Sequence, residues 1–223
     1  MAFLPRHGLR HELPPHRIPY RANLWALRQL GVRRVLAPSA AGSLRPGIHP
    51  GDLVVCDQLV DRTSGRADTF YEGPNVQHVP FADPYCAEMG SVVTEAARGH
   101  GATVHPAGTM VVIQGPRFST RAESGWYRSA GWDVIGMTQY PESVLARELG
   151  LCYCGVALVT DYDTGVEGDE SVGAVTMEAV MEVLRGMIGL VRTVLASAVP
   201  GLAAPRTCGC AANVPELGQA GSP

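Results

Sequence analysis

The sequence predicts a single α/β domain built on a mixed, largely parallel sheet flanked by helices. Three observations predict this class. Apolar runs of strand length alternate with helical patterns along most of the chain. The 223 residues suit one domain of roughly 100–200 residues, and 46% are apolar, which is enough for a sizeable core. There is no internal repeat. We therefore expect one domain of strands and helices over residues 1–200, followed by a flexible tail over 201–223.

The first half of the chain predicts two helices and two strands. Apolar residues at helical spacing between 19 and 30 end at Gly31, a typical helix stop. Apolar stretches at 33–37 and 52–60 predict strands, and a long crossover without regular structure separates them from the next helix. The expected elements are a helix at 19–30, strands at 33–37 and 52–60, a loop at 61–82 and a helix at 83–100.

The second half has clearer signals. Thr120 and Glu123 form a capping box, Pro141 suits the first turn of a helix, and residues 109–113 and 151–159 are continuous apolar runs typical of buried strands. The last helix has an apolar stripe at helical spacing, made by Val180, Leu184, Met187, Ile188, Val191 and Leu195. The expected elements are strands at 109–113, 132–135 and 151–159, a helix from the capping box, a helix from Pro141 to 149 and a long helix near 177–199.

Charge and cysteine usage narrow the class of protein. Eighteen Lys and Arg against 21 Asp and Glu give a net charge of −3, so we expect no binding to nucleic acid or to an anionic membrane. The start of the chain lacks the apolar core of a signal peptide, and four charged residues interrupt the apolar stretch at 177–199. We therefore expect a cytoplasmic protein.

The six cysteines predict neither a disulfide framework nor a metal site. They stand at positions 56, 86, 152, 154, 208 and 210, so that two pairs have the spacing C-x-C. Zinc sites commonly use C-x₂₋₄-C or nearby histidines, and neither pattern occurs here. We expect reduced thiols and no metal, and the spacing assigns no role to Cys208 and Cys210.

Four groups of chemically versatile residues follow predicted strands, where ligands bind in α/β sheets. Arg6 and His7 could hold an oxyanion or form a solvated basic turn. The small residues at 38–43 form an expected turn whose backbone N–H groups could approach an anion, although an ordinary turn fits equally well. The segment 114–123 could place Phe118 at a pocket mouth or in the core. Asp161 and Asp163 lie on one side of an extended segment, where they could bind a metal, cap a turn or hydrogen-bond a ligand.

Seven segments of the chain resemble the trimeric purine nucleoside phosphorylase family, and within it most closely the 5′-methylthioadenosine phosphorylases. The resemblance runs in order from about residue 2 to 199, and segments 57–63 and 115–124 are its most specific parts. The segments are 3–8, 18–27, 39–44, 57–63, 115–124, 134–138 and 160–163. It implies a phosphorylase-type fold, a homotrimer and phosphorolysis of a purine nucleoside, with no cofactor besides the co-substrate phosphate.

The resemblance also implies roles for individual residues. The implied phosphate ligands are Arg6, His7, Ser39, Ala40 through its backbone, and Thr138. The implied nucleoside contacts are Met137 at the ribose, Phe118 and Ile113 at the base, Asp161 and Asp163 at N7 and the 6-amino group, and His78 at the 5′ pocket of a neighbouring subunit. Cleavage leaves positive charge on the sugar and negative charge on the base. An acid near N7 and an anion below C1′ therefore both favour the transition state, with Asp161 as the expected acid.

Two departures from the family leave alternatives open. Gln114 stands where the family usually has Glu, which removes a charge near the nucleoside. Family members also begin with a strand and a Gly-rich phosphate turn, whereas this chain begins at Met1, directly before Ala-Phe-Leu-Pro-Arg-His. A GTG valine codon can act as a start, and we expect a start assigned too late. The alternatives to methylthioadenosine phosphorolysis are a phosphorylase for 6-oxopurine nucleosides or methylthioinosine, and an inactive truncated fragment.

Overall fold

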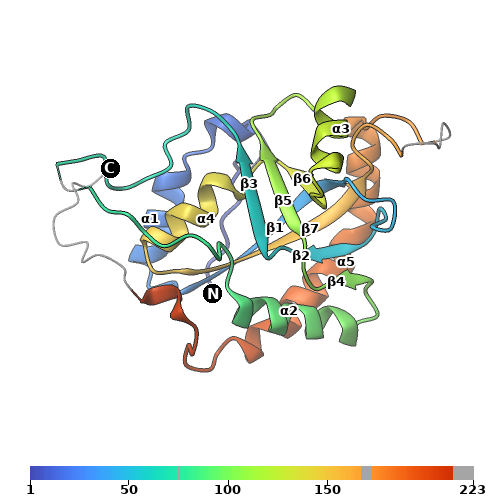
Figure 1. The fold of residues 1–223 in the computed structure, drawn as a ribbon. Coiled ribbons are helices and arrows are strands. Elements are labelled where there is room, and N and C mark those ends of the chain that lie inside the picture. The colour runs from blue at the N-terminus through green and yellow to red at the C-terminus, as the bar shows by residue number, and fades with distance from the viewer. Residues whose placement is uncertain (75, 167–171, 213–223) are drawn as a thin grey trace.

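Seven strands form one mixed sheet with helices on both faces (Figure 1). The structure is a computed structural model and describes residues 1–74, 76–166 and 172–212. The strand order is β3-β5-β6-β1-β7-β2-β4. The strands are β1 Arg34–Ser43, β2 Leu53–Val55, β3 Gln58–Arg62, β4 Val104–His105, β5 Thr109–Ile113, β6 Val134–Gly136 and β7 Cys152–Asp161. The helices are α1 Tyr20–Gln29, α2 Ala87–Gly99, α3 Arg121–Ser129, α4 Gln139–Glu148 and α5 Met177–Gly201, with short 3₁₀ turns at Pro15–Arg17 and Gly209–Ala211.

Strand β7 lies in the interior of the sheet, next to the middle strand β1, and separates two apolar layers. It pairs in parallel with β1 along almost its whole length and antiparallel with β2. Successive strand residues point to opposite faces. Tyr153, Ala157 and Val159 accordingly pack in the layer of α1 and α4. Cys154, Val156 and Leu158 pack in the layer of α2 and α5. The prediction of an α/β domain with a mixed, mostly parallel sheet is confirmed.

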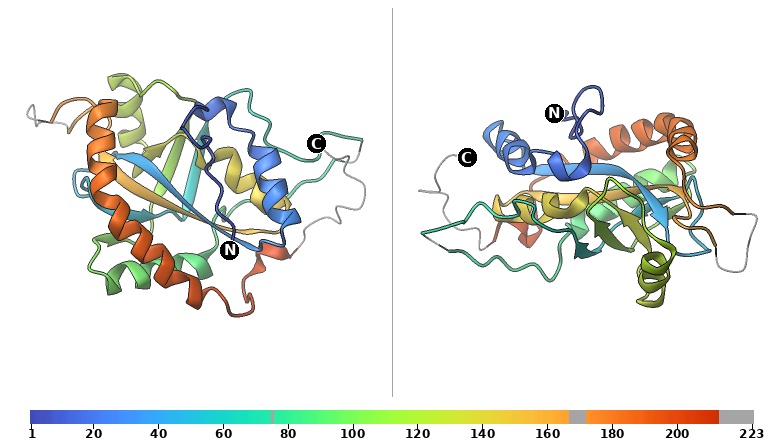
Figure 2. Two further views of the ribbon diagram at one scale, coloured as in Figure 1. Left: turned by 180° about the vertical axis from the view of Figure 1, so that it is seen from behind. Right: turned by 90° about the horizontal axis from the view of Figure 1, so that it is seen from above.

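The two apolar layers are covered by different pairs of helices. α1 packs beside α4 and α2 beside α5 (Figure 1), and from behind α5 is the long helix along one side of the sheet (Figure 2). α3 covers β5 and β6 through a third cluster that includes Tyr127, Val111 and Ile135. The carboxyl ends of β5, β6 and β7 thus carry the loops that lead into α3, α4 and α5.

Several local predictions agree closely with the structure. The predicted strand at 109–113 is β5, and the capping box of Thr120 and Glu123 opens α3 with both of its hydrogen bonds present. Pro141 lies in the first turn of α4. In the apolar stripe of α5, Val180, Met187 and Val191 are buried, but Ile188 is 46% exposed. The prediction that Ile188 belongs to the buried face is wrong, because the helix turns it away from the sheet.

Two strand predictions are wrong in their extent. The stretch 52–60 is two strands, because the chain leaves the sheet at Cys56 and Asp57: β2 pairs with β7 and β4, whereas β3 pairs with β5 at the opposite edge. The strand predicted at 33–37 continues to Ser43, so the expected turn at 38–43 does not exist. Its small side chains allow the strand to continue through the crowded centre of the sheet.

The two ends of the chain lie outside the sheet. In the described structure residues 1–14 form neither helix nor strand, and Phe3 is 90% exposed. Of the tail predicted over 201–223, Arg206, Thr207 and Cys208 hydrogen-bond to the body of the protein, and residues 213–223 lie outside the described residues. None of the described helices combines the length and the apolar character needed to cross a bilayer.

Candidate active site

Arg6 is half-buried against the edge of β1 and is held by an acidic partner. Its Nε and Nη2 donate to the two carboxylate oxygens of Glu142 at 2.6 and 3.0 Å, and its Nη1 donates to the carbonyl of Pro38 at 2.9 Å. Glu142 also accepts from the hydroxyl of Tyr153 at 2.8 Å. Burial works against the charge of Arg6, but the carboxylate of Glu142 outweighs it and raises the Arg6 pKa. The guanidinium is thus a fixed cation next to Ser39.

These contacts leave capacity for an anion. A guanidinium has five N–H donors, and the contacts with Glu142 and Pro38 engage three of them. The two that remain belong to the terminal nitrogens Nη1 and Nη2. Nothing in the sequence pattern identified Glu142 as the partner of Arg6, because 136 residues separate the two.

His7 is fixed by the loop that follows it. Its Nδ1 lies 2.8 Å from the carbonyl oxygen of Leu13, and its ring stacks on His11 at 4.3 Å between centroids. A carbonyl can only accept, so Nδ1 carries the proton. Burial lowers the pKa of His7, with the neighbouring charge of Arg6 adding to the effect. Near neutral pH the ring is therefore neutral, with Nε2 free to accept a hydrogen bond.

Ser39 and Ala40 lie within β1, where they pair with Ala157 and Leu158 of β7. The expectation that they sit in an anion-binding turn is wrong in its backbone geometry. The carbonyl of the preceding Pro38 accepts from Arg6, so this residue faces the edge of β1 away from β7. A proline tolerates such an edge because it has no N–H to leave unpaired. Ser39 Oγ accepts a long hydrogen bond of 3.4 Å from Gln139.

Thr138 and Met137 form the turn between β6 and α4. Thr138 is buried, and its Oγ1 has no hydrogen-bond partner among the described residues. A buried hydroxyl without a partner costs free energy unless a ligand or water completes it. Gly115 adopts a φ of +61°, and a Cβ there would lie 2.6 Å from Met137 Sδ, so glycine permits the end of β5 to meet this turn. Ile113 is buried, whereas Phe118 is 36% exposed at the loop surface.

Arg66 joins this turn to the loop after β3, and sequence reasoning missed it. Its guanidinium donates to the carbonyls of Gln114 and Met137 at 2.8 and 2.9 Å and to that of Tyr140 at 2.5 Å. Burial lowers the pKa of Arg66. Gln114 accepts from Arg66 Nε at 3.2 Å and exchanges two hydrogen bonds with the backbone of Ser64. Its amide therefore serves this loop with both its donor and its acceptor.

The two predicted carboxylates lie at the carboxyl end of β7, Asp161 as the last residue of the strand and Asp163 in the turn after it. The prediction that they share an extended segment is wrong, because Asp163 has the left-handed φ of +53° and Asp161 caps the turn, which was one of the alternatives left open. Asp161 Oδ1 accepts from the backbone N–H of Asp163 and Oδ2 from the hydroxyl of Thr160, both at 2.7 Å. Each carboxylate oxygen has a second lone pair, so Asp161 can still accept from a ligand. Asp163 is 3% exposed with a φ of +53°, and its Oδ2 has no partner within the described residues. The site thus has one half-buried carboxylate with two hydrogen bonds, that of Asp161, and one buried carboxylate with an open oxygen, that of Asp163.

Burial shifts both carboxyl groups towards their neutral forms. It raises the pKa of Asp161 against the opposing hydrogen bonds of Thr160 and Asp163. It raises the pKa of Asp163 as well, with Ser124 opposing the shift and the charge of Asp161 adding to it. Such a pair can share or donate a proton more readily than exposed aspartates.

A chain of contacts joins the predicted residues. Arg6 bonds the residue before Ser39, Ser39 bonds the residue after Thr138, and Met137 meets Gly115. Gly42 brings β1 close to the carboxylates, because a Cβ there would lie 2.8 Å from Asp161 Oδ1. His78 is different: it is exposed on the long loop between β3 and α2, which extends beyond the sheet (Figures 1 and 2).

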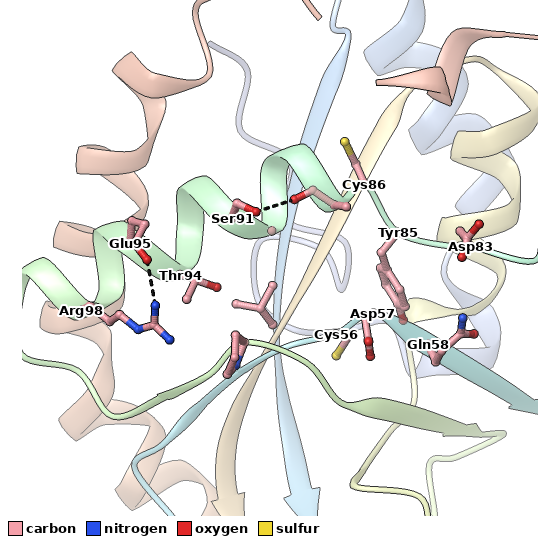
Figure 3. Close-up of a pocket in the computed structure, with 14 residues that line it drawn as sticks. Cys56, Asp57, Gln58, Asp83, Tyr85, Cys86, Ser91, Thr94, Glu95 and Arg98 are labelled. Carbon is pink, nitrogen blue, oxygen red and sulfur yellow. Dashed lines mark hydrogen bonds and ion pairs between the residues drawn. The ribbon is translucent and has the colours of Figure 1, made fainter. Parts of the chain in front are cut away.

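A separate cleft of about 490 Å³ lies between α2 and the strands β2 and β3 (Figure 3). Its polar lining includes Asp57, Gln58 and Asp83, and none of the predicted site residues lines it. Tyr85 connects it to the site, since its hydroxyl donates to Gln139 at 2.5 Å. Gln139 therefore links Tyr85, which lines the cleft, to Ser39 of the predicted site.

Comparison with known proteins gives a consistent result. The sequence profile described as Phosphorylase superfamily matches residues 1–196. The chain is 60% identical over 182 residues to the S-methyl-5′-thioadenosine phosphorylase of Mycolicibacterium smegmatis, covering 82% of this chain and 68% of that protein. It is 51% identical over 222 residues to the purine nucleoside phosphorylase of Streptomyces coelicolor, covering 95% and 78%.

Solved structures extend the comparison to the fold. A double mutant of the adenosine/methylthioadenosine phosphorylase of Schistosoma mansoni, in complex with adenine, superposes with a TM-score of 0.86 at 39% identity. The match covers 91% of this chain and 78% of that one.

Proposed function

The chain belongs to the phosphorylase superfamily, and on that premise we propose that it is a pentosyltransferase that cleaves S-methyl-5′-thioadenosine with inorganic phosphate. The products are adenine and 5-methylthioribose 1-phosphate. The observation that carries the proposal is the carboxylate pair of the half-buried Asp161 and the buried Asp163, whose pKa values are both raised. Relatives named S-methyl-5′-thioadenosine phosphorylase at 48–60% identity support this substrate.

The carboxylates act on the base. As the bond from C1′ to N9 breaks, electrons move into the purine, and an acid at N7 neutralises them. We assign this proton to Asp161. Asp163, with an oxygen that lacks a partner in the described chain, accepts from the 6-amino group. A carboxylate suits that donor better than an oxopurine edge, because O6 requires a donor from the protein.

The phosphate lies on the opposite side of the sugar in this proposal. The remaining N–H groups of Arg6, the neutral His7 and the unpartnered hydroxyl of Thr138 support it. Ser39 adds a hydroxyl and Ala40 a backbone contact. Because Nε2 of His7 is an acceptor, it matches the O–H of the monoprotonated anion. Phosphate then attacks C1′ as the nucleophile, and no metal or organic cofactor takes part.

The nucleoside is held by apolar contacts. Met137 lies against the ribose, and Ile113 and Phe118 flank the base. We propose a cytoplasmic homotrimer in which His78 reaches the 5′ pocket of a neighbouring subunit. Its exposure on a loop that extends beyond the sheet supports this role (Figure 1).

The test is release of adenine from methylthioadenosine by the full chain, with and without phosphate. We expect turnover that saturates with phosphate and a trimer in sedimentation velocity. Binding of methylthioadenosine without any phosphate-dependent turnover would identify a non-catalytic fragment and contradict the proposal.

A second candidate is a phosphorylase for 6-oxopurine nucleosides or methylthioinosine. The purine nucleoside phosphorylase of Streptomyces coelicolor, at 51% identity, favours it. Inosine and methylthioinosine assayed beside methylthioadenosine separate the two. A higher kcat/KM for either oxopurine would replace the first proposal with the second.

A further inference from the structure

Four of the six cysteines meet at the amino end of β7, far along the strand from Asp161. They are Cys86, directly before α2; Cys152, the first residue of β7; and Cys208 and Cys210, which follow α5. Their Sγ atoms all lie within 4.8 Å of one another, and the pair Cys152 and Cys208 is 3.4 Å apart. Three of the four side chains are buried and Cys208 is half-buried. No other group of metal-binding side chains occurs in the part of the chain that the structure describes.

The backbone holds three of these residues in place. The N–H of Cys86 donates to the carbonyl of Tyr153 at 2.8 Å, and that of Cys152 to the carbonyl of Arg33 at 2.9 Å. The N–H of Cys208 donates to the carboxylate of Glu88 at 3.1 Å. Cys86 also lines the cleft, but in Figure 3 its sulfur points away from Cys56 and Asp57.

Glu88 anchors the segment that supplies Cys208 and Cys210. Its Oε2 accepts from the N–H and the hydroxyl of Thr207 at 2.8 and 2.6 Å, and its Oε1 pairs with Arg34 at 2.9 Å. Arg206 holds the same segment through the carbonyl of Gly150 at 2.8 Å. The segment after α5 is therefore docked by groups that are not thiols.

We propose that these four thiolates bind one structural Zn²⁺ ion. Zinc takes four sulfur ligands at about 2.3 Å in a tetrahedron, which places the sulfurs roughly 3.8 Å apart. The observed separations bracket that value, so small side-chain rotations complete the site. Two disulfides would divide the four sulfurs into pairs, whereas a tetrahedral ion uses all of them at similar distances.

Charge and ligand chemistry agree with zinc. Four thiolates around Zn²⁺ carry a net charge of −2, and Arg206 Nη1 lies 3.9 Å from Cys152 Sγ, where it offsets that charge. An all-sulfur set favours zinc over magnesium or calcium, which prefer oxygen. A four-coordinate site of this kind has no open position, so its role is to fasten the segment around residues 206–210 to β7 and α2.

The spacing rule, which predicted no metal, does not describe a cluster assembled from separate elements. It assumes two ligands from one knuckle of the chain, but here Cys86 and Cys152 come from separate elements. The C-x-C pair lies in the 3₁₀ turn Gly209–Ala211 and its preceding residue.

The test is metal analysis of the full chain purified with a reductant and without chelator. We expect about one zinc per chain by inductively coupled plasma mass spectrometry. After exchange with Co²⁺ we expect the visible absorption spectrum of a tetrahedral cobalt–thiolate site. The double variant Cys208→Ala/Cys210→Ala should lose both signals and melt at a Tm lower by roughly 5 °C or more. Its methylthioadenosine cleavage at 25 °C should be unchanged.

Cys154→Ala is the matched control, because Cys154 is a buried cysteine outside the cluster. It should keep the zinc. Fully reduced wild-type protein without zinc and without a cobalt spectrum would overturn the proposal even if the double variant failed to fold. So would disulfides among these cysteines in protein whose thiols were trapped by alkylation at cell lysis.

Discussion

The two ends of β7 hold the most concentrated chemistry in the molecule, and they are built differently. At the carboxyl end, Asp163 Oδ2 is buried without a partner in the described chain. At the amino end, the carboxylate of Glu88 receives hydrogen bonds from Arg34, Thr207 and Cys208, and only the Nε of Arg34 is buried without a partner there among the described residues. A buried polar group left open is costly, and it persists where a ligand completes it.

The difference teaches which end serves chemistry and which serves structure. The carboxyl end keeps unused hydrogen-bonding capacity, which a substrate can fill. The amino end brings distant segments of the chain together, chiefly through the hydrogen bonds of Glu88. Substitutions at the two ends should therefore separate catalysis from stability, and the variants below test that separation.

Asp161→Ala should cause the largest loss of activity. Removing the acid should lower kcat/KM for methylthioadenosine by about 10²–10⁴-fold, the usual contribution of general acid catalysis. The Tm should change little, because partial burial disfavours the charged form of this carboxyl group and offsets what its hydrogen bonds contribute. Steady-state assays and a thermal melt measure both.

Glu95→Ala is the control. Glu95 is an acidic residue of the separate cleft, and it forms an ion pair with Arg98. It should leave kcat/KM unchanged. Activity of Asp161→Ala within tenfold of wild type would remove Asp161 from the role of acid.

Arg6→Ala should have the next largest effect, on phosphate. A charged hydrogen bond contributes about 1.5–3 kcal/mol, so KM for phosphate should rise roughly 10- to 150-fold, with a much smaller change for the nucleoside. The variant should also be unstable, because Glu142 would remain buried without its cation, a change that costs about 3–5 kcal/mol.

The double variant Arg6→Ala/Glu142→Gln separates the two effects. It removes the uncompensated charge, so the Tm should recover while KM for phosphate stays high. If KM recovers together with Tm, Arg6 is a structural residue and does not bind phosphate.

Sequence reasoning succeeded where chemistry is local in the chain. The capping box of α3 and the strand β5 are each specified by adjacent residues. It failed where distant segments decide. The small residues at 38–43 predict a turn, but pairing with the distant strand β7 makes them part of a strand. Glu142 and Arg66 act through partners far away in the sequence, which no periodicity reveals.

Asp163→Asn should shift the preference between substrates. The amide can donate to O6 of an oxopurine, whereas the carboxylate can only accept, so the ratio of kcat/KM for inosine to that for methylthioadenosine should rise about tenfold or more. Asparagine also tolerates the left-handed backbone at this position, where φ is +53°. An unchanged ratio would show that residue 163 does not contact that edge of the base.

The same variant should be more stable at neutral pH. Burial raises the folded-state pKa of Asp163 above the ordinary value of about 3.9. The folded state therefore gains stability from the protonated group at low pH and loses it as pH rises through the raised pKa. Asparagine does not ionise, so the Tm advantage of the variant should grow between pH 4 and pH 7. An advantage that does not depend on pH would contradict the buried charge.

Gln114→Glu should have the smallest effect and the most specific one. Glutamate can accept from Arg66 and from the N–H of Ser64 as glutamine does, and its charge favours the cation of Arg66. It loses the donor that now reaches the carbonyl of Ser64 at 2.9 Å. A partly exposed ion pair contributes about 0.2–1 kcal/mol, so we expect kcat/KM for methylthioadenosine to change by no more than about fivefold.

Its effect should appear in selectivity, because the added charge lies next to the loop that leads to Phe118. The ratio of kcat/KM for methylthioadenosine to that for inosine should increase. Gln58→Glu is the control, since it makes the same change at an exposed position in the separate cleft. If both variants leave the ratio unchanged, the amide at 114 only supports the loop of Arg66, and selectivity depends on the carboxyl end of β7 alone.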